Sequence, residues 1–102
     1  MKQIALVTLL LLVAAGVACA MQHEPTVEKG KALFNDTALG TSGKSCGSCH
    51  PDGQGLEEAG AKEHLAATVN ACIKAPLKGK ALDEKSPEMQ SLLLYIQSLG
   101  KR

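Results

Sequence analysis

Residues 46–50 read Cys-Gly-Ser-Cys-His, and this stretch decides how the rest of the chain is interpreted. The chain has 102 residues with one Tyr, one Phe and no Trp, so its core must be small and mainly aliphatic. A domain of this size usually needs a further source of stability, such as disulfides, a metal or a large apolar cofactor. The thiols and the imidazole of residues 46–50 can hold such a group.

The spacing of this motif is that of a haem attachment sequence. Two thiols three positions apart can form thioethers with the two vinyl groups of a porphyrin, and the histidine that follows can ligate the iron. We therefore predict one covalent haem c held by Cys46 and Cys49, with His50 as the proximal iron ligand. The faces of the porphyrin would replace the aromatic side chains that the core lacks.

Three other chemistries are open to the same residues. Cys46 and Cys49 could form a structural disulfide. They could also form a thioredoxin-like redox pair, although that fold needs strands and the chain has no β-branched alternation. A zinc site could use Cys46, Cys49, His50 or His64, and Cys72, although structural zinc sites usually have paired knuckles. The helical pattern and the export sequence described below favour haem.

The N-terminal residues have the pattern of a secretory signal peptide. Lys2 precedes an uncharged apolar run over residues 4–18, which is shorter than the roughly 20 residues of a membrane-spanning helix. Ala18-Cys19-Ala20 resembles a cleavage site, which predicts a signal peptide over residues 1–20 and a mature domain over residues 21–102. Cys19 is also a candidate for lipid attachment. We expect an exported, periplasmic protein that is held at a membrane only if Cys19 is lipidated.

Hydrophobic periodicity predicts an all-α fold of three to four short helices. A first helix runs from a cap at Thr26 to about residue 35, and Gly30 within it favours close approach of another backbone. Its apolar face consists of Val27, Gly30, Leu33 and Phe34. A second helix runs over about residues 61–73 and ends before Pro76. Its apolar face consists of Leu65, Val69, Cys72 and Ile73.

A third helix has the clearest boundaries. Ser86 is a good N-cap, Pro87 suits the first helical position and Gly100 follows the last turn. Its apolar stripe consists of Met89, Leu92, Leu93, Ile96 and Leu99, with Tyr95 beside it. Residues 37–45 and 51–60 have the composition of loops.

Residues 26–99 resemble the class I c-type cytochromes. The likeness lies in Gly30-Lys31-Ala32-Leu33-Phe34 ahead of the Cys-x-x-Cys-His motif, and in Tyr95-Ile96 of the last helix. In that family the first and last helices cross at near right angles, with a glycine at the contact and aromatic rings beside it. Gly30, Phe34 and Tyr95 match these roles. The resemblance implies a small cytochrome c-like fold around one haem, with electron transfer as its function.

The iron ligand on the distal side is less clear, because residues 74–85 lack the methionine that the family usually has there. Leu82 stands about where that methionine is expected. Met89 continues the apolar stripe of the last helix, so core packing is its expected role. Asn70, His64 and a vacant site are further alternatives.

Residues 65–96 are similar to the cysteine-ligated haem domains of thiosulfate dehydrogenases and, less closely, of SoxA-type cytochromes. The likeness includes Asn70-Ala71-Cys72, and in those dehydrogenases the corresponding cysteine coordinates the haem iron. The resemblance therefore implies Cys72 as the distal ligand, whereas a buried thiol without a role is the alternative. Two departures are the single haem motif and Thr68, which stands where the dehydrogenases have an arginine.

Taken together, the sequence predicts an exported electron carrier rather than an enzyme. An enzyme or enzyme subunit of oxidative sulfur chemistry with a Cys72-ligated haem is the alternative, and a sensor that binds a small gas is a third possibility. The formal net charge of +1 argues against binding to nucleic acid. We expect a monomer that meets redox partner proteins. The residues that could steer an acidic partner are Lys74, Lys78, Lys80 and Lys85.

Overall fold

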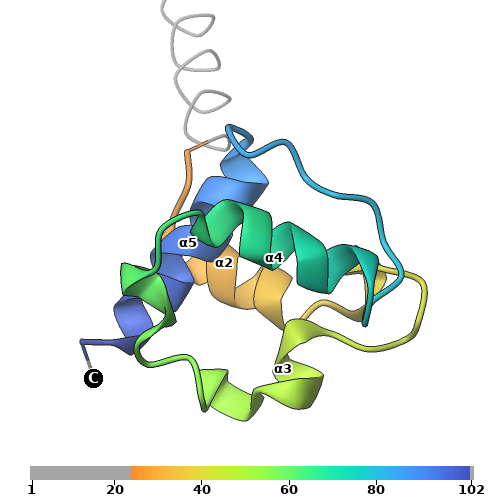
Figure 1. Cartoon of the computed structure of the whole chain (residues 1–102), viewed down its shortest axis with the longest axis horizontal. Coiled ribbons are helices and arrows are strands. Elements are labelled where there is room, and N and C mark those ends of the chain that lie inside the picture. Colours follow the sequence, from red (N-terminus) through yellow and green to blue (C-terminus); the bar gives the residue numbers. More distant parts are fainter. Residues whose placement is uncertain (1–23, 102) are drawn as a thin grey trace, which may run out of the picture.

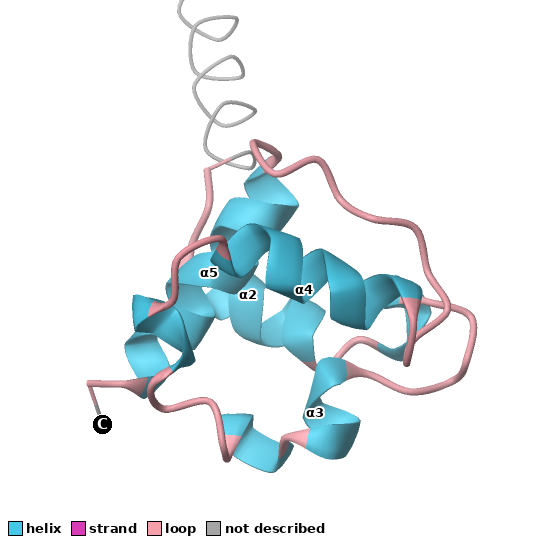
Figure 2. Ribbon diagram, viewed as in Figure 1, coloured by secondary structure: helices cyan, strands magenta, loops and turns pink. Residues whose placement is uncertain are grey.

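The computed structural model describes residues 24–101, so the predicted signal peptide, its cleavage site and Cys19 lie outside the described residues. Within residues 24–101 the regular structure is helical and contains no strand, which confirms the all-α prediction (Figures 1 and 2). None of the helices in this range is long and apolar enough to cross a membrane. The elements are α2 (Val27–Phe34), η1 (Thr37–Leu39), α3 (Cys46–Cys49), η2 (Pro51–Gly53), η3 (Ala59–Ala61), α4 (Leu65–Lys74) and α5 (Pro87–Leu99).

Helix α2 begins and ends where the sequence predicts. The Thr26 hydroxyl caps it by accepting a hydrogen bond from the Lys29 backbone N–H at 3.0 Å. Gly30 and Phe34 are buried as expected. Val27 is 38% exposed, so its predicted place on the buried face is wrong, and the buried residues of α2 begin at Gly30.

Helices α2 and α5 pack closely at Gly30. A Cβ atom on this glycine would overlap the backbone carbonyl of Ser91 and approach Cβ of Tyr95 to 2.8 Å. Beside this contact the rings of Phe34 and Tyr95 meet edge to face, with centroids 5.1 Å apart. Because a larger residue would separate the two backbones, the predicted need for glycine is confirmed.

Helix α4 begins later than predicted. It starts at Leu65, and Ala61 belongs instead to the short 3-10 helix η3. His64 precedes α4 with a left-handed backbone (φ 58°), which prevents the helix from extending back toward Ala61. The helix ends at Lys74, before Pro76, as expected.

Helix α5 matches its prediction at both ends. The Ser86 hydroxyl accepts a hydrogen bond from the Met89 backbone N–H at 3.2 Å, Pro87 occupies the first turn and Gly100 follows the last. Met89 is fully buried, which confirms its predicted place in the core. The core is completed by Phe34, Leu65, Val69, Ile73, Leu77, Leu92, Tyr95, Ile96 and Leu99.

The two predicted loops contain the short 3-10 helices η1, η2 and η3. The first loop is tied to the segment that follows α4, because the Thr41 backbone N–H donates to the Leu77 carbonyl at 2.9 Å and its hydroxyl donates to the Lys78 carbonyl at 2.8 Å. From there the chain runs along the outside of the fold to α5 (Figure 1). These hydrogen bonds connect the segment before α3 to the segment after α4.

Candidate functional site

An apolar pocket lies between α3 and α4. Its floor is formed by buried side chains of α2 and α5, which are Phe34, Leu92 and Ile96. Protein atoms leave about 920 Å³ free within it, part of which is open to solvent. Most of its lining is apolar, which suits a large apolar group.

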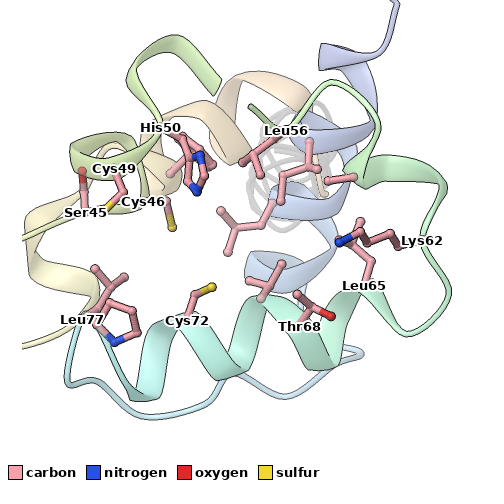
Figure 3. Close-up of a pocket in the computed structure, with 16 residues that line it drawn as sticks. Ser45, Cys46, Cys49, His50, Leu56, Lys62, Leu65, Thr68, Cys72 and Leu77 are labelled. Atoms are coloured by element: carbon pink, nitrogen blue, oxygen red, sulfur yellow. The ribbon is translucent and has the colours of Figure 1, made fainter. Parts of the chain in front are cut away.

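The two motif cysteines lie on one wall of this pocket (Figure 3). Helix α3 holds them one turn apart, and Ser45 caps it through a reciprocal contact in which its backbone N–H donates to the Ser48 hydroxyl at 2.9 Å. A Cβ atom at Gly47, between them, would overlap the side-chain oxygen of Asn35, so a larger residue there would require this exposed side chain to move. Cys46 is half-buried and Cys49 is exposed, and both have free thiols rather than a disulfide.

His50 extends from the end of α3 and its ring points into the pocket (Figure 3). Its Nδ1 atom lies 2.9 Å from the backbone oxygen of Gln54. Because a carbonyl oxygen can only accept, Nδ1 is the donor, and in the neutral imidazole this leaves Nε2 with a free lone pair. A carbonyl partner on the other nitrogen is the usual arrangement for a metal-ligating histidine.

Cys72 lies on the opposite wall, on α4, with its sulfur turned toward the same space (Figure 3). It shares the pocket-lining face of this helix with Leu65 and Val69, as the periodicity predicts, but unlike them it is exposed. Of the four residues on this apolar face, Ile73 alone lies outside the pocket lining and is fully buried in the core. The thiol is therefore not buried in the core, as the alternative role for Cys72 requires.

The Cys46 and Cys72 thiols are close enough for an electrostatic interaction. Burial raises the pKa of the Cys46 thiol above its ordinary value, and the negative charge of an ionised Cys72 raises it further. Both thiols also line the same pocket. A group that binds one of the sulfurs covalently, or a cation bound by an ionised sulfur, would remove this repulsion.

The other predicted distal ligands do not line the pocket. Met89 is fully buried in the core and His64 is exposed at the start of α4. Asn70 is buried, with its amide N–H donating to the Leu82 carbonyl at 2.9 Å and its oxygen accepting from the Leu82 N–H at 2.8 Å. Pro76 and Leu77 line the pocket where Leu82 was expected. Of the side chains considered as distal ligands, Cys72 alone borders it.

A zinc cluster is not assembled in the described part of the chain. Among residues 24–101 no group of three or more His, Cys, Asp or Glu side chains is arranged to hold a metal ion. The four lysines that could steer a partner or simply form a solvated basic stretch are exposed and lie outside the pocket lining; they are Lys74, Lys78, Lys80 and Lys85.

Three pocket features were not predicted from the sequence. Thr68 lines the pocket one turn before Cys72, Lys62 lines it from the loop before α4, and the Gln54 carbonyl orients His50. The Gln54 and Lys62 contacts depend on loop conformation, which has no periodic pattern. The place of Thr68 follows from helix geometry, since residues four apart share a face.

No protein-family model matches the chain, and comparisons with curated proteins and with solved structures found no match either. The site is therefore defined by its own chemistry: an all-α domain with an apolar pocket that presents two thiols and an imidazole on one wall. These residues fit a haem, because thiols for vinyl groups, an imidazole lone pair for iron and apolar walls for a porphyrin all face one space. On the far wall Cys72 offers a soft sulfur donor.

Proposed function

We propose that the chain is an exported monohaem c-type cytochrome that transfers electrons. The observation that carries this proposal is the arrangement of Cys46, Cys49 and His50 on one wall of the apolar pocket, with the Nδ1 atom of His50 engaged by Gln54. An isolated five-residue motif can occur by chance. A chance motif would not be expected to line an apolar pocket with its histidine already oriented.

The packing of the first and last helices supports the same proposal. The resemblance to class I c-type cytochromes implies a glycine at the helix contact and aromatic rings beside it. Gly30 meets the backbone of α5 in this way, and Phe34 and Tyr95 form the aromatic pair. Phe34 also lines the pocket, so this contact and the candidate haem site share a side chain.

The chain's own residues would have distinct roles. A bound haem supplies an iron that alternates between the ferric and ferrous states. Cys46 and Cys49 would hold it covalently and His50 would ligate the iron, with the Gln54 carbonyl fixing the ring and increasing the basicity of Nε2. Apolar side chains such as Leu65 and Ile96 exclude water, which limits the solvent rearrangement that accompanies each change of charge.

The position of Cys72 favours a second candidate function, an enzyme or enzyme subunit of oxidative sulfur chemistry. Cys72 borders the pocket opposite His50, as the resemblance to thiosulfate dehydrogenases implies. Thr68 borders it as well, at the position of the arginine in those enzymes, but a hydroxyl carries no charge to hold an anion. With one haem motif in the chain, electron transfer remains the better-supported function.

Expression in a bacterium with a c-type haem maturation system tests the proposal. We expect haem staining to remain with the polypeptide after denaturing electrophoresis, and the purified protein to be reduced and reoxidised reversibly. A colourless wild-type protein, or haem that acidic organic solvent extracts, would overturn it. Carbon monoxide binding to the reduced protein would instead favour the gas-binding alternative, and oxidation of thiosulfate with an external acceptor would favour the enzyme.

A further inference from the structure

The pocket has a charged side chain at one end. Lys62 is the only residue in the pocket lining that carries a full charge at neutral pH, and no carboxylate lines the pocket. It lies between η3 and α4 and is exposed, so it stands at the rim. Figure 3 shows Lys62 across the pocket from Cys46 and Cys49, with its nitrogen turned toward the space between them.

The arrangement of substituents on a haem suggests which group would lie near Lys62. The two vinyl groups lie on one half of the porphyrin and the two propionates on the other. If Cys46 and Cys49 hold the vinyl half, the propionate half extends away from α3 and toward the wall that carries Lys62. A carboxylate at the edge of an apolar pocket is costly without a compensating cation or hydrogen bond.

We propose that Lys62 is the cationic partner of the haem propionates and that it sets part of the reduction potential. This inference rests on the proposed function, because it needs a covalent haem. An ammonium group beside the propionates offsets their negative charge. Since their negative charge stabilises ferric iron relative to ferrous iron, Lys62 holds the potential higher than it would otherwise be.

Other charged groups near Lys62 in sequence are not placed for this role. Glu63 and His64 follow it directly but do not line the pocket. Glu57 and Glu58 border a separate surface hollow together with Lys101. The remaining titratable side chains in the pocket lining are His50 and the three cysteines, which have roles on its other walls.

The test is a comparison of holoprotein variants by spectroelectrochemistry. Lys62→Gln removes the charge, Lys62→Arg keeps it, and Lys101→Gln removes an equal charge outside the pocket lining. We expect Lys62→Gln to lower the midpoint potential, and Lys62→Arg and Lys101→Gln to leave it near the wild-type value. The drop should become smaller at high ionic strength, because salt screens a charge at an exposed rim.

A second readout follows the carboxylates themselves. The infrared difference spectrum between the reduced and oxidised protein contains propionate carboxylate bands, and we expect Lys62→Gln, but not Lys101→Gln, to shift them. Equal potentials in Lys62→Gln and the wild type would overturn the inference and leave the covalent haem intact. An equal drop in Lys62→Gln and Lys101→Gln, or in Lys62→Arg, would also overturn it. Failure of the wild type to bind haem would overturn the proposed function instead.

Discussion

The Nδ1 atom of His50 lies 2.9 Å from the backbone oxygen of Gln54, and this contact determines which ring nitrogen is available to the pocket. The chain reverses direction between the two residues through Asp52 and Gly53, which have φ values of 53° and 77°. The Gly53 backbone N–H also donates to the His50 carbonyl at 2.8 Å. The orientation of the imidazole therefore depends on a left-handed turn four residues long.

Gly53→Ala should destabilise this turn. A Cβ atom at Gly53 would lie 2.5 and 2.6 Å from the two methyl carbons of Leu99, a side chain that is only 2% exposed. We expect a loss of about 1–3 kcal/mol in the free energy of unfolding from this overlap, with about 1 kcal/mol more from the left-handed conformation. Urea unfolding of the holoprotein measures the sum of these two losses.

Gly43→Ala is the matched control for Gly53. Gly43 has φ 80°, but a Cβ atom there would meet nothing within 4 Å. We expect only the conformational cost, about 1 kcal/mol. If the two alanine variants lost the same stability, the contact with Leu99 would not support the turn that orients His50.

The Cys46→Ala and Cys49→Ala variants should bind much less haem, and the double variant should not unfold cooperatively on heating. Among the described residues only ten hydrophobic side chains form the buried core, and several of them also line the pocket, so the apolar contacts that a haem would add there are a large part of what so small a domain can bury. Haem staining and circular dichroism measure the two effects. Cys72→Ala is the control, because it should keep the covalent haem. A cooperative thermal transition in the double variant would contradict the folding part of this prediction.

Asn70→Ala should release the segment that connects α4 to α5. Both ends of this buried amide bond to the Leu82 backbone, so its loss leaves a donor and an acceptor without partners. We expect a loss of about 1–3 kcal/mol in the free energy of unfolding. Gln90→Ala is the control, since its amide bonds to the Glu84 carbonyl of the same segment at 2.8 Å but in an exposed position. Equal effects would show that burial of Asn70 contributes nothing.

Features that depend on local chemistry could be predicted from the sequence. Thr26 and Ser86 are caps whose hydroxyls accept the expected hydrogen bonds, and Gly30 lies at a helix contact that admits no Cβ atom. Each of these follows from a residue type that suits one backbone position. The Cys-x-x-Cys-His motif likewise predicts haem attachment from its spacing alone, without reference to the rest of the fold.

Features that depend on tertiary arrangement could not be predicted in the same way. The start of α4 is set by the left-handed backbone at His64, a conformation that residues other than glycine seldom adopt. Cys72 shares its predicted face with Leu65 and Val69, but periodicity cannot show that this face lines a pocket and leaves Cys72 exposed. Lys62 reaches the pocket from a loop, where no periodic pattern exists.

Replacing Cys72 tests the distal side of the proposed haem site. As an anionic sulfur ligand, Cys72 would stabilise ferric iron and hold the reduction potential below that of a histidine–methionine cytochrome. Cys72→Met should therefore raise the midpoint potential, and Cys72→Ala should open the distal side and change the ferric spin state. Electrochemistry and the ferric optical spectrum report the two changes.

Met89→Leu is the control, because Met89 is buried in the core outside the pocket lining and its loss should leave both readouts unchanged. If Cys72→Ala leaves the ferric spectrum and the midpoint potential unchanged, Cys72 is not an iron ligand. If Met89→Leu instead loses a methionine-to-iron band, Met89 is the distal ligand, and α5 must rearrange when haem binds.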